Sequence, residues 1–89
     1  MGQKKIAVIV RERQSEALRM SVGLTVLDDQ VEIFITEPLK DDQKTLTELE
    51  GAMELGLKIY SSTEDQRFQR LSPDEMAEKI LEYDHIIPY

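Results

Sequence analysis

An uninterrupted apolar run near the start of the chain, Ile6–Val10, constrains the fold more than any other feature. Its β-branched residues predict a strand that is buried on both faces, as in a parallel sheet. Further strands are predicted at Val31–Ile35, Leu57–Ser61 and Ile86–Ile87, and a short helical turn at Arg67–Leu71. Helical patterns separate the strands, so the chain is expected to form a small three-layer α/β fold. Its parallel sheet would have about four strands, with helices on both faces.

The ends of the helices are marked by capping residues. The first helix carries an apolar stripe from Ala17 to Leu27. Asp41 or Asp42 is expected to start the second helix, and Gly56 to close it in the left-handed conformation. Before the third helix, Ser72–Glu75 combines a capping serine, a proline at the first helical position and the glutamate of a capping box.

The apolar content of the strands also predicts their order. The first strand is the most apolar, so it is placed at the centre of the sheet. In the second strand, apolar residues alternate around Glu32 and Phe34, which is typical of a more exposed strand at an edge. The third strand then lies on the other side of the first, and the predicted order is 2-1-3-4.

This order predicts where a ligand would bind. In open α/β sheets, ligands bind beyond the carboxyl ends of the strands, at the point where the strand order reverses. Here that point lies between the first and third strands, so the loops Arg11–Ser15 and Ser61–Asp65 are expected to meet. The candidate ligand-binding residues in these loops are Arg11, Arg13, Gln14, Ser15, Ser61, Ser62 and Thr63.

The first of these loops favours an anion. Ser15 is expected to cap the helix that follows, and the free N–H groups and dipole at a helix start favour negative charge. The alternative is that Arg11 and Arg13 only pair with carboxylates on a solvated rim, namely Glu12, Glu16 or Glu64. Ion pairs of that kind contribute little to stability.

Length and charge limit the possible partners. The 89 residues are enough for one domain, which is expected to span 1–89. The net charge of −7 argues against binding to nucleic acid or to an anionic membrane surface. No apolar run could span a bilayer, and no signal-peptide pattern opens the chain. We therefore expect a cytoplasmic protein that binds neither nucleic acid nor membranes.

The sequence predicts no catalytic residue, cofactor or metal site. The chain has no cysteine, and His85 is its only histidine, so it cannot supply the four nitrogen or sulfur ligands of a zinc site. Its four glycines form no phosphate-binding loop. Ser62 would act as a nucleophile only with a base nearby. His85 starts its strand, whereas Ser62 follows the end of a parallel one, so the two are expected at opposite edges of the sheet.

Three stretches of the chain share their hydrophobic pattern with a known family. The stretches are the helix at 16–24 with the strand that follows it, the segment Gly51–Tyr60, and the loop and capped helix from Ser61 to Glu75. In these stretches the chain resembles the DsrE/DsrF/DsrH-like family of small sulfur-relay proteins, which includes the Tus subunits.

The resemblance implies a fold, an assembly and a missing activity. Members of the family assemble into dimers or hexamers, and active members hold a cysteine just past the third strand and pass sulfur as a persulfide. That position falls at Ser62, or at Ser61, in this chain. A serine hydroxyl cannot form a persulfide, and it lacks the low pKa of a thiol. The resemblance therefore implies a subunit without the family's sulfur-transfer activity.

Two functions follow from these patterns. The first is a non-catalytic DsrE-like subunit or interaction module, which forms a homo-oligomer between a dimer and a hexamer and binds a protein partner of a sulfur-relay or redox pathway. The second is a small-molecule or anion-binding domain, which uses the crevice at the carboxyl ends of the first and third strands.

Overall fold

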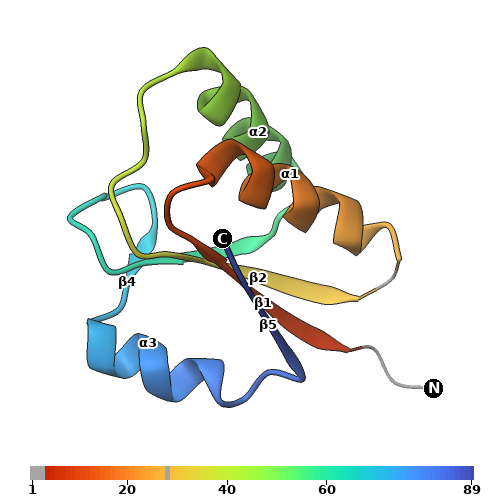
Figure 1. Cartoon of the computed structure of the whole chain (residues 1–89), viewed down its shortest axis with the longest axis vertical. Coiled ribbons are helices and arrows are strands. Elements are labelled where there is room, and N and C mark those ends of the chain that lie inside the picture. The colour runs from red at the N-terminus through yellow and green to blue at the C-terminus, as the bar shows by residue number, and fades with distance from the viewer. Residues whose placement is uncertain (1–3, 28) are drawn as a thin grey trace.

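The structure, a computed structural model, describes residues 4–27 and 29–89 and thus all but four residues of the predicted 1–89 domain. Strands and helices alternate along the chain, except that β3 and β4 follow each other directly (Figure 1). The elements are β1 (Lys5–Val10), α1 (Gln14–Thr25), β2 (Gln30–Ile35), α2 (Gln43–Glu54), β3 (Lys58–Ser61), β4 (Gln69–Arg70), α3 (Pro73–Ile80) and β5 (His85–Pro88).

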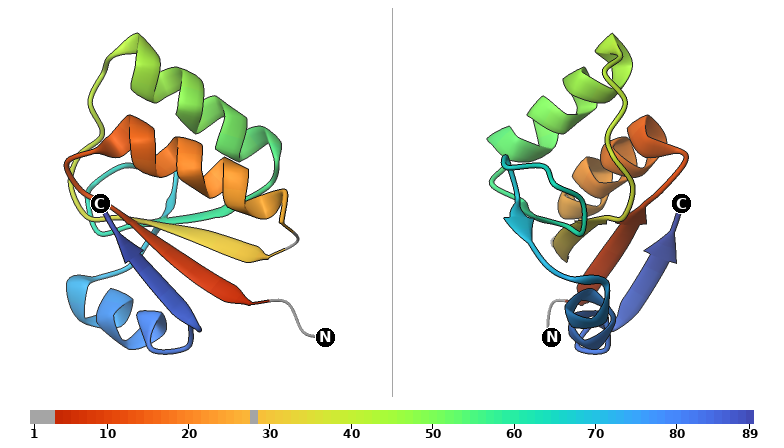
Figure 2. Two further views of the ribbon diagram at one scale, coloured as in Figure 1. Left: turned by 45° about the vertical axis from the view of Figure 1, so that its right-hand side comes forward. Right: turned by 90° about the vertical axis from the view of Figure 1, so that its left-hand side faces the viewer.

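All five strands form one parallel sheet, which confirms the predicted α/β class. Helices α1 and α2 lie side by side over one face of the sheet, and α3 covers the other face (Figures 1 and 2). The predicted three layers are therefore present. None of the helices in the described ranges is long and apolar enough to cross a membrane.

The predicted strand order 2-1-3-4 is wrong, because the observed order is β4-β3-β2-β1-β5. Strand β2 pairs with both β1 and β3 and lies at the centre of the sheet. The alternation in β2 was misleading, since Phe34 is apolar and completely buried. Only Glu32 interrupts the apolar run, and its carboxylate accepts hydrogen bonds from Tyr83 and Gln30. A buried carboxylate with partners leaves a strand fit for the interior.

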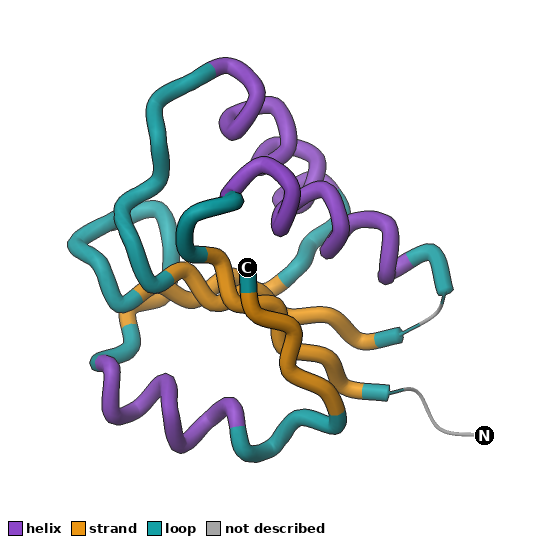
Figure 3. Tube along the Cα trace, viewed as in Figure 1, coloured by secondary structure: helices purple, strands orange, loops and turns teal. Residues whose placement is uncertain are grey.

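A fifth strand, β4, replaces the helical turn that was predicted at Arg67–Leu71. Gln69 and Arg70 pair with Tyr60 and Ser61 of β3 and so extend the sheet beyond its predicted edge (Figure 3). Two residues are too short for a strand signal in the sequence. Their pairing depends on the free edge that β3 presents after the chain has folded.

The two faces of the sheet have different cores. Toward α1 and α2 the apolar side chains that the strands present are all aliphatic, and they pack against helix residues such as Leu18 and Leu49. Toward α3 they present Phe34 and Tyr60, which pack against Met76 and the neighbouring aromatic and aliphatic side chains. Phe34 stacks on Tyr60 with the ring centroids 5.1 Å apart.

Most of the predicted helix ends are confirmed. Asp42 caps α2 by accepting a hydrogen bond of 2.7 Å from the Thr45 N–H, and Gly56 has a φ of +73° after this helix. The capping box at the start of α3 is complete, with both hydrogen bonds between Ser72 and Glu75 present.

The first helix differs from its prediction at both ends. Arg13, and not Ser15, is the N-cap residue of α1, and its side chain forms no capping hydrogen bond. The helix ends at Thr25, so Val26 and Leu27 lie outside it and are 81% and 69% exposed. The last two residues of the predicted apolar stripe therefore lie beyond the end of α1 and do not pack against the sheet.

Candidate functional site

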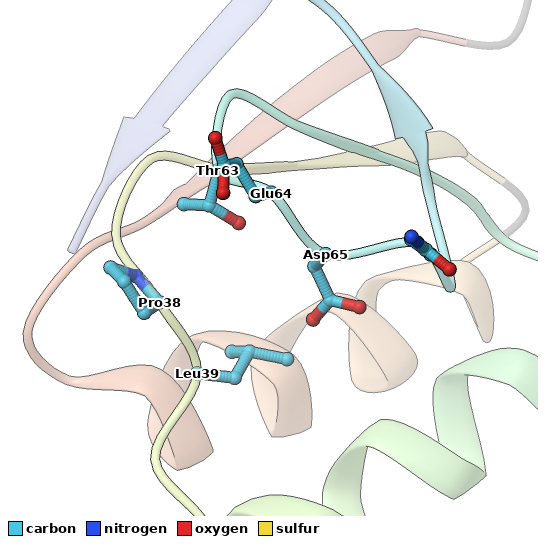
Figure 4. Close-up of a pocket in the computed structure, with 6 residues that line it drawn as sticks. Pro38, Leu39, Thr63, Glu64 and Asp65 are labelled. Carbon is cyan, nitrogen blue, oxygen red and sulfur yellow. The ribbon is translucent and has the colours of Figure 1, made fainter.

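An open groove lies beyond the carboxyl ends of β2 and β3. It occupies about 390 Å³ between the loop that follows β2 and the loop that follows β3. Pro38 and Leu39 form one wall, and Thr63, Glu64, Asp65 and Gln66 form the other (Figure 4). The groove lies at the edge of the sheet where parallel α/β proteins bind ligands, and it is the candidate binding site of this chain.

Ser61 orders the start of the second wall. Its side chain is completely buried, and its hydroxyl accepts a hydrogen bond of 3.1 Å from the Thr63 N–H. The hydroxyls of Ser61 and Thr63 are also 2.6 Å apart and share a hydrogen bond. The Ser62 N–H donates to the Ile35 carbonyl and ties this loop to the end of β2. Of the two consecutive serines, Ser61 and Ser62, only Ser62 reaches the surface.

Asp65 is held in place by Arg67. The Arg67 guanidinium donates two hydrogen bonds to the Asp65 carboxylate, of 2.9 and 2.6 Å, and the Arg67 N–H donates a third. These bonds outweigh the effect of partial burial, so the pKa of Asp65 lies below its ordinary value. The wall therefore carries a fixed, ionised carboxylate.

Gln14 holds the opposite wall. Its side chain is 4% exposed, and its amide nitrogen donates to the carbonyls of Arg11 and Pro38 at 3.1 and 2.9 Å. Its amide oxygen accepts a hydrogen bond of 2.8 Å from the Lys40 N–H. Gln14 thus joins the loop after β1 to the loop after β2, and these three internal bonds leave little capacity for a ligand.

The crevice predicted between the loops Arg11–Ser15 and Ser61–Asp65 is not formed, because β2 lies between β1 and β3. Arg11 and Arg13 are exposed and do not line the groove. Arg13 lies 4.0 Å from Glu16 in an exposed ion pair, as the alternative interpretation predicted. Ser15 lies in the first turn of α1. Of the seven candidates, only Thr63 lines the groove, while Gln14 and Ser61 support its walls.

The reversal of strand order lies instead between β1 and β5. Tyr89 lies against this point. Its N–H donates to the Ile9 carbonyl, and its carbonyl accepts from the Glu12 N–H. Its hydroxyl donates to the Met20 sulfur at 3.1 Å. These contacts place Tyr89 where the topological rule predicts a ligand.

Sequence reasoning did not assign Pro38 and Leu39 to the site. The available signal was Glu37-Pro38, which ends the second strand at the carboxyl edge of the sheet. With β2 placed at an edge beside β1, its loop was not expected to face the loop after β3. The central position of β2 is what brings these two loops together.

The groove lacks the parts of a nucleophilic active site. His85 starts β5, whereas Ser62 follows the end of β3, so in a parallel sheet they lie at opposite ends of the strands, as predicted. Among the described residues, no three histidine, aspartate or glutamate side chains are grouped to hold a metal ion. What the groove offers is binding by one apolar wall and one polar wall.

A second surface feature lies at the opposite end of the molecule. The carboxyl ends of α1 and α2 lie side by side there (Figure 2), and a hollow of about 210 Å³ between them is lined by Thr25, Gly56 and Leu57, among others. Four large apolar side chains stand exposed next to these ends. They are Val26, Leu27, Met53 and Leu55, which we call the apolar end.

Comparisons of the chain with protein-family models, with curated proteins and with solved structures find no match. The groove and the apolar end are therefore the features of the molecule that indicate a function.

Proposed function

We propose that this chain is a cytoplasmic, non-catalytic interaction module of the DsrE-like kind, which associates with further copies of itself and binds a protein partner of a sulfur-relay or redox pathway. The observation that carries the proposal is the apolar end. Contiguous exposed apolar side chains mark association surfaces in soluble proteins, whereas scattered ones are ordinary. Among the described residues, four of the six large apolar side chains that are exposed lie at or just after the carboxyl ends of α1 and α2.

The polar side chains that could act in binding or catalysis support the same proposal, because hydrogen bonds within the protein already use their donors and acceptors. The Ser61 hydroxyl is bonded to Thr63, and the Gln14 amide is bonded to the backbone of two loops. Tyr83 and Glu32 bond to each other in the core beneath α3. These groups stabilise the fold, so we infer that the function depends on side chains at the surface.

The charges around the apolar end favour a second copy as the partner. Lys58 and Glu54 are exposed beside it, and Asp29 is half-buried there. None of these three forms an ion pair with another described residue. In a twofold interface, each contact between two different residues occurs twice, once in each direction. Lys58 of each copy can therefore face a carboxylate of the other around an apolar centre.

Sedimentation velocity at high micromolar concentration tests the proposal. We expect the wild-type chain to sediment as a dimer or larger, and the double variant Leu27→Asp, Leu55→Asp to sediment as a monomer. The matched control is Leu81→Asp, since Leu81 is 81% exposed but lies at the end of α3. A strictly monomeric wild type, or a control that dissociates as completely as the double variant, would contradict the proposal.

The family relationship is part of the proposal. The stretches that carry the resemblance form most of α1 and β2, the end of α2, β3, β4 and the start of α3, which supports a fold of the expected class. Ser61 and Ser62 lie at the carboxyl end of β3 beside the groove, where the resemblance places the sulfur-carrying cysteine of active members. A chain with serine there would contribute binding to such an assembly.

The groove supports a second candidate function, the binding of a small molecule. Gln14 holds one wall by donating to the Pro38 carbonyl, and Ser61 holds the other by accepting from the Thr63 N–H, so the site is preformed. Chemical-shift perturbation of the amide signals at Leu39 and Thr63–Gln66 would detect such a ligand, and the absence of any shift across a broad set of metabolites would rule it out.

A further inference from the structure

We infer that the groove between Pro38–Leu39 and Thr63–Gln66 receives a cationic group, an ammonium or a guanidinium, at the end of a short apolar chain. The inference deepens the second candidate function and rests on it. It reverses the charge that the sequence predicted for the ligand, because the structure places different side chains around the site.

The side chains that line the groove carry a net negative charge. Of the six residues that line the groove, Glu64 and Asp65 are carboxylates and none is basic. Arg11 and Arg13, on which an anion site would depend, lie outside it. The two loops that form the walls, residues 36–42 and 62–68, contain five acidic residues and only two basic ones. The charge near the groove therefore favours a cation.

Arg67 lies beside the Asp65 carboxylate and leaves it able to accept a further hydrogen bond. Arg67 occupies one side of the Asp65 carboxylate and, with Phe68, lines a separate hollow beside Met53. Its hydrogen bond with Asp65, together with the charges of Asp65 and Asp41, raises the pKa of Arg67, so this pair stays ionised. A carboxylate has about four lone-pair sites, so Asp65 can accept a further donor from the groove, while Glu64 is exposed and has no ion-pair partner among the described residues.

The wall opposite the carboxylates is apolar. Pro38 and Leu39 face the carboxylate-bearing segment across the groove (Figure 4), and Gln14 fixes their backbone. A chain of a few methylene groups can lie against this wall while its charged end reaches Glu64 and Asp65. The hollow behind the Thr63–Gln66 segment shares Glu64 and Asp65 with the groove, but its lining residues outside this segment are Phe68 and Arg70. The positive charge of Arg70 makes that hollow less favourable for a cation than the groove.

The same chemistry exists in two sources, a free alkylamine or alkylguanidine and a lysine or arginine side chain of a partner protein. The experiment separates them. Amide chemical shifts are followed while the whole chain is titrated with four probes of similar length, pentylamine, butylguanidinium, pentanol and pentanoate. Blocked tripeptides with a central lysine or arginine form the second arm.

We expect pentylamine and butylguanidinium to shift the signals of Leu39 and Thr63–Gln66, with affinities roughly fivefold or more above that of pentanol. A free-ligand site binds these probes at least as tightly as the tripeptides, whereas a partner-binding site binds the tripeptides more tightly. Glu64→Gln should weaken binding by about threefold to tenfold. Glu78→Gln, an exposed change of the same kind on α3, should leave it unchanged.

Arg67→Gln sharpens the test, because it removes the cation that competes for Asp65, so the affinity for pentylamine should rise. Tighter binding of pentanoate or pentanol at the same signals would overturn the cationic assignment and leave the second candidate function standing. Shifts that appear nowhere in the groove with any probe would remove both.

Discussion

The two faces of the sheet pack against their helices through different kinds of side chain. Beneath α1 and α2, two helices of 12 residues each, the fully buried core side chains are aliphatic, and the half-buried Phe68 and Tyr89 pack against them. Beneath α3, a helix of eight residues in which only Met76 is buried, the core depends on three aromatic rings and on the buried Glu32. Long helices bury enough apolar area by themselves, whereas a short helix needs specific contacts to stay docked.

The α3 face is therefore expected to be the more specific of the two. Phe34 stacks on Tyr60 and meets Tyr83 edge-on, with centroids 5.4 Å apart. The Tyr83 hydroxyl donates a hydrogen bond to the Glu32 carboxylate, and the Gln30 amide donates a second one of 3.0 Å. Lys5 and Lys79 lie over the rings of Tyr83 and Tyr60. Losing one member should weaken several contacts at once, which is not expected on the aliphatic face.

Removing the central ring should have the largest effect. We expect Phe34→Ala to lower the free energy of unfolding by about 3–5 kcal/mol, because it removes a fully buried ring and both aromatic pairs. Ile33→Val, the neighbouring change on the aliphatic face, should cost about 0.5–1.5 kcal/mol. Urea unfolding followed by circular dichroism measures both. Equal losses would show that the two faces are equally tolerant.

Removing one hydroxyl should come next. Tyr83→Phe deletes the hydrogen bond to the ionised Glu32, so we expect a loss of about 1.5–3 kcal/mol. The matched control is Tyr89→Phe, whose hydroxyl donates only to the Met20 sulfur, and its loss should stay below about 0.5 kcal/mol. The same urea experiment compares the two, and a smaller loss for Tyr83→Phe than for Tyr89→Phe would refute the role assigned to Glu32.

A capping change should have a smaller effect on the α3 face. Ser72→Ala removes the capping box of α3 and should lower the free energy of unfolding by about 1 kcal/mol. Ser15→Ala should change it by less than about 0.5 kcal/mol, because Ser15 caps no helix in the structure. Thermal and urea unfolding would detect the difference. A loss for Ser15→Ala as large as that for Ser72→Ala would restore the predicted cap.

The smallest expected effect is a pH dependence of the α3 face. Burial raises the pKa of Glu32, but the hydrogen bonds from Tyr83 and Gln30, with the charges of Lys5 and Lys79, lower it by more, so it lies below its ordinary value of 4.5. A lowered pKa in the folded state means stability that is present above the unfolded-state pKa and is lost as the pH falls through the folded-state value.

The comparison with Glu32→Gln isolates this contribution, because Asp42, Asp65 and Glu75 also have lowered pKa values and titrate in the same range. The free energy of unfolding should fall less steeply for Glu32→Gln than for the wild type between neutral pH and about pH 3. Parallel curves for the two proteins would mean that the Glu32 carboxylate makes no net contribution.

The fold class and the candidate site were predictable to different degrees. The buried run Ile6–Val10, the cap at Asp42, the closing Gly56 and the capping box of α3 all depend on neighbouring residues, and the structure confirms each of them. The position of β2 was not predictable in the same way. Its alternation resembles that of an edge strand until Tyr83, 51 residues further along the chain, is seen to satisfy Glu32.

The site follows the same division. Thr63 was predicted to lie in a loop at the carboxyl edge of the sheet, and it lines the groove there. Pro38 and Leu39 were not predicted to lie beside it, because their place opposite Thr63 depends on which strands are neighbours. The basic residues Arg11 and Arg13 looked like ligands in the sequence, and the strand order leaves them outside the groove.

By itself, the sequence determined that the chain alternates strands and helices, that these strands run parallel, and where most of the helices begin and end, because apolar periodicity and capping act over a few residues. Only the tertiary structure decided that β2 is central, that β4 exists and that the groove has two carboxylates and no basic side chain. Those properties depend on contacts between residues far apart in the chain, and such contacts have no local signature.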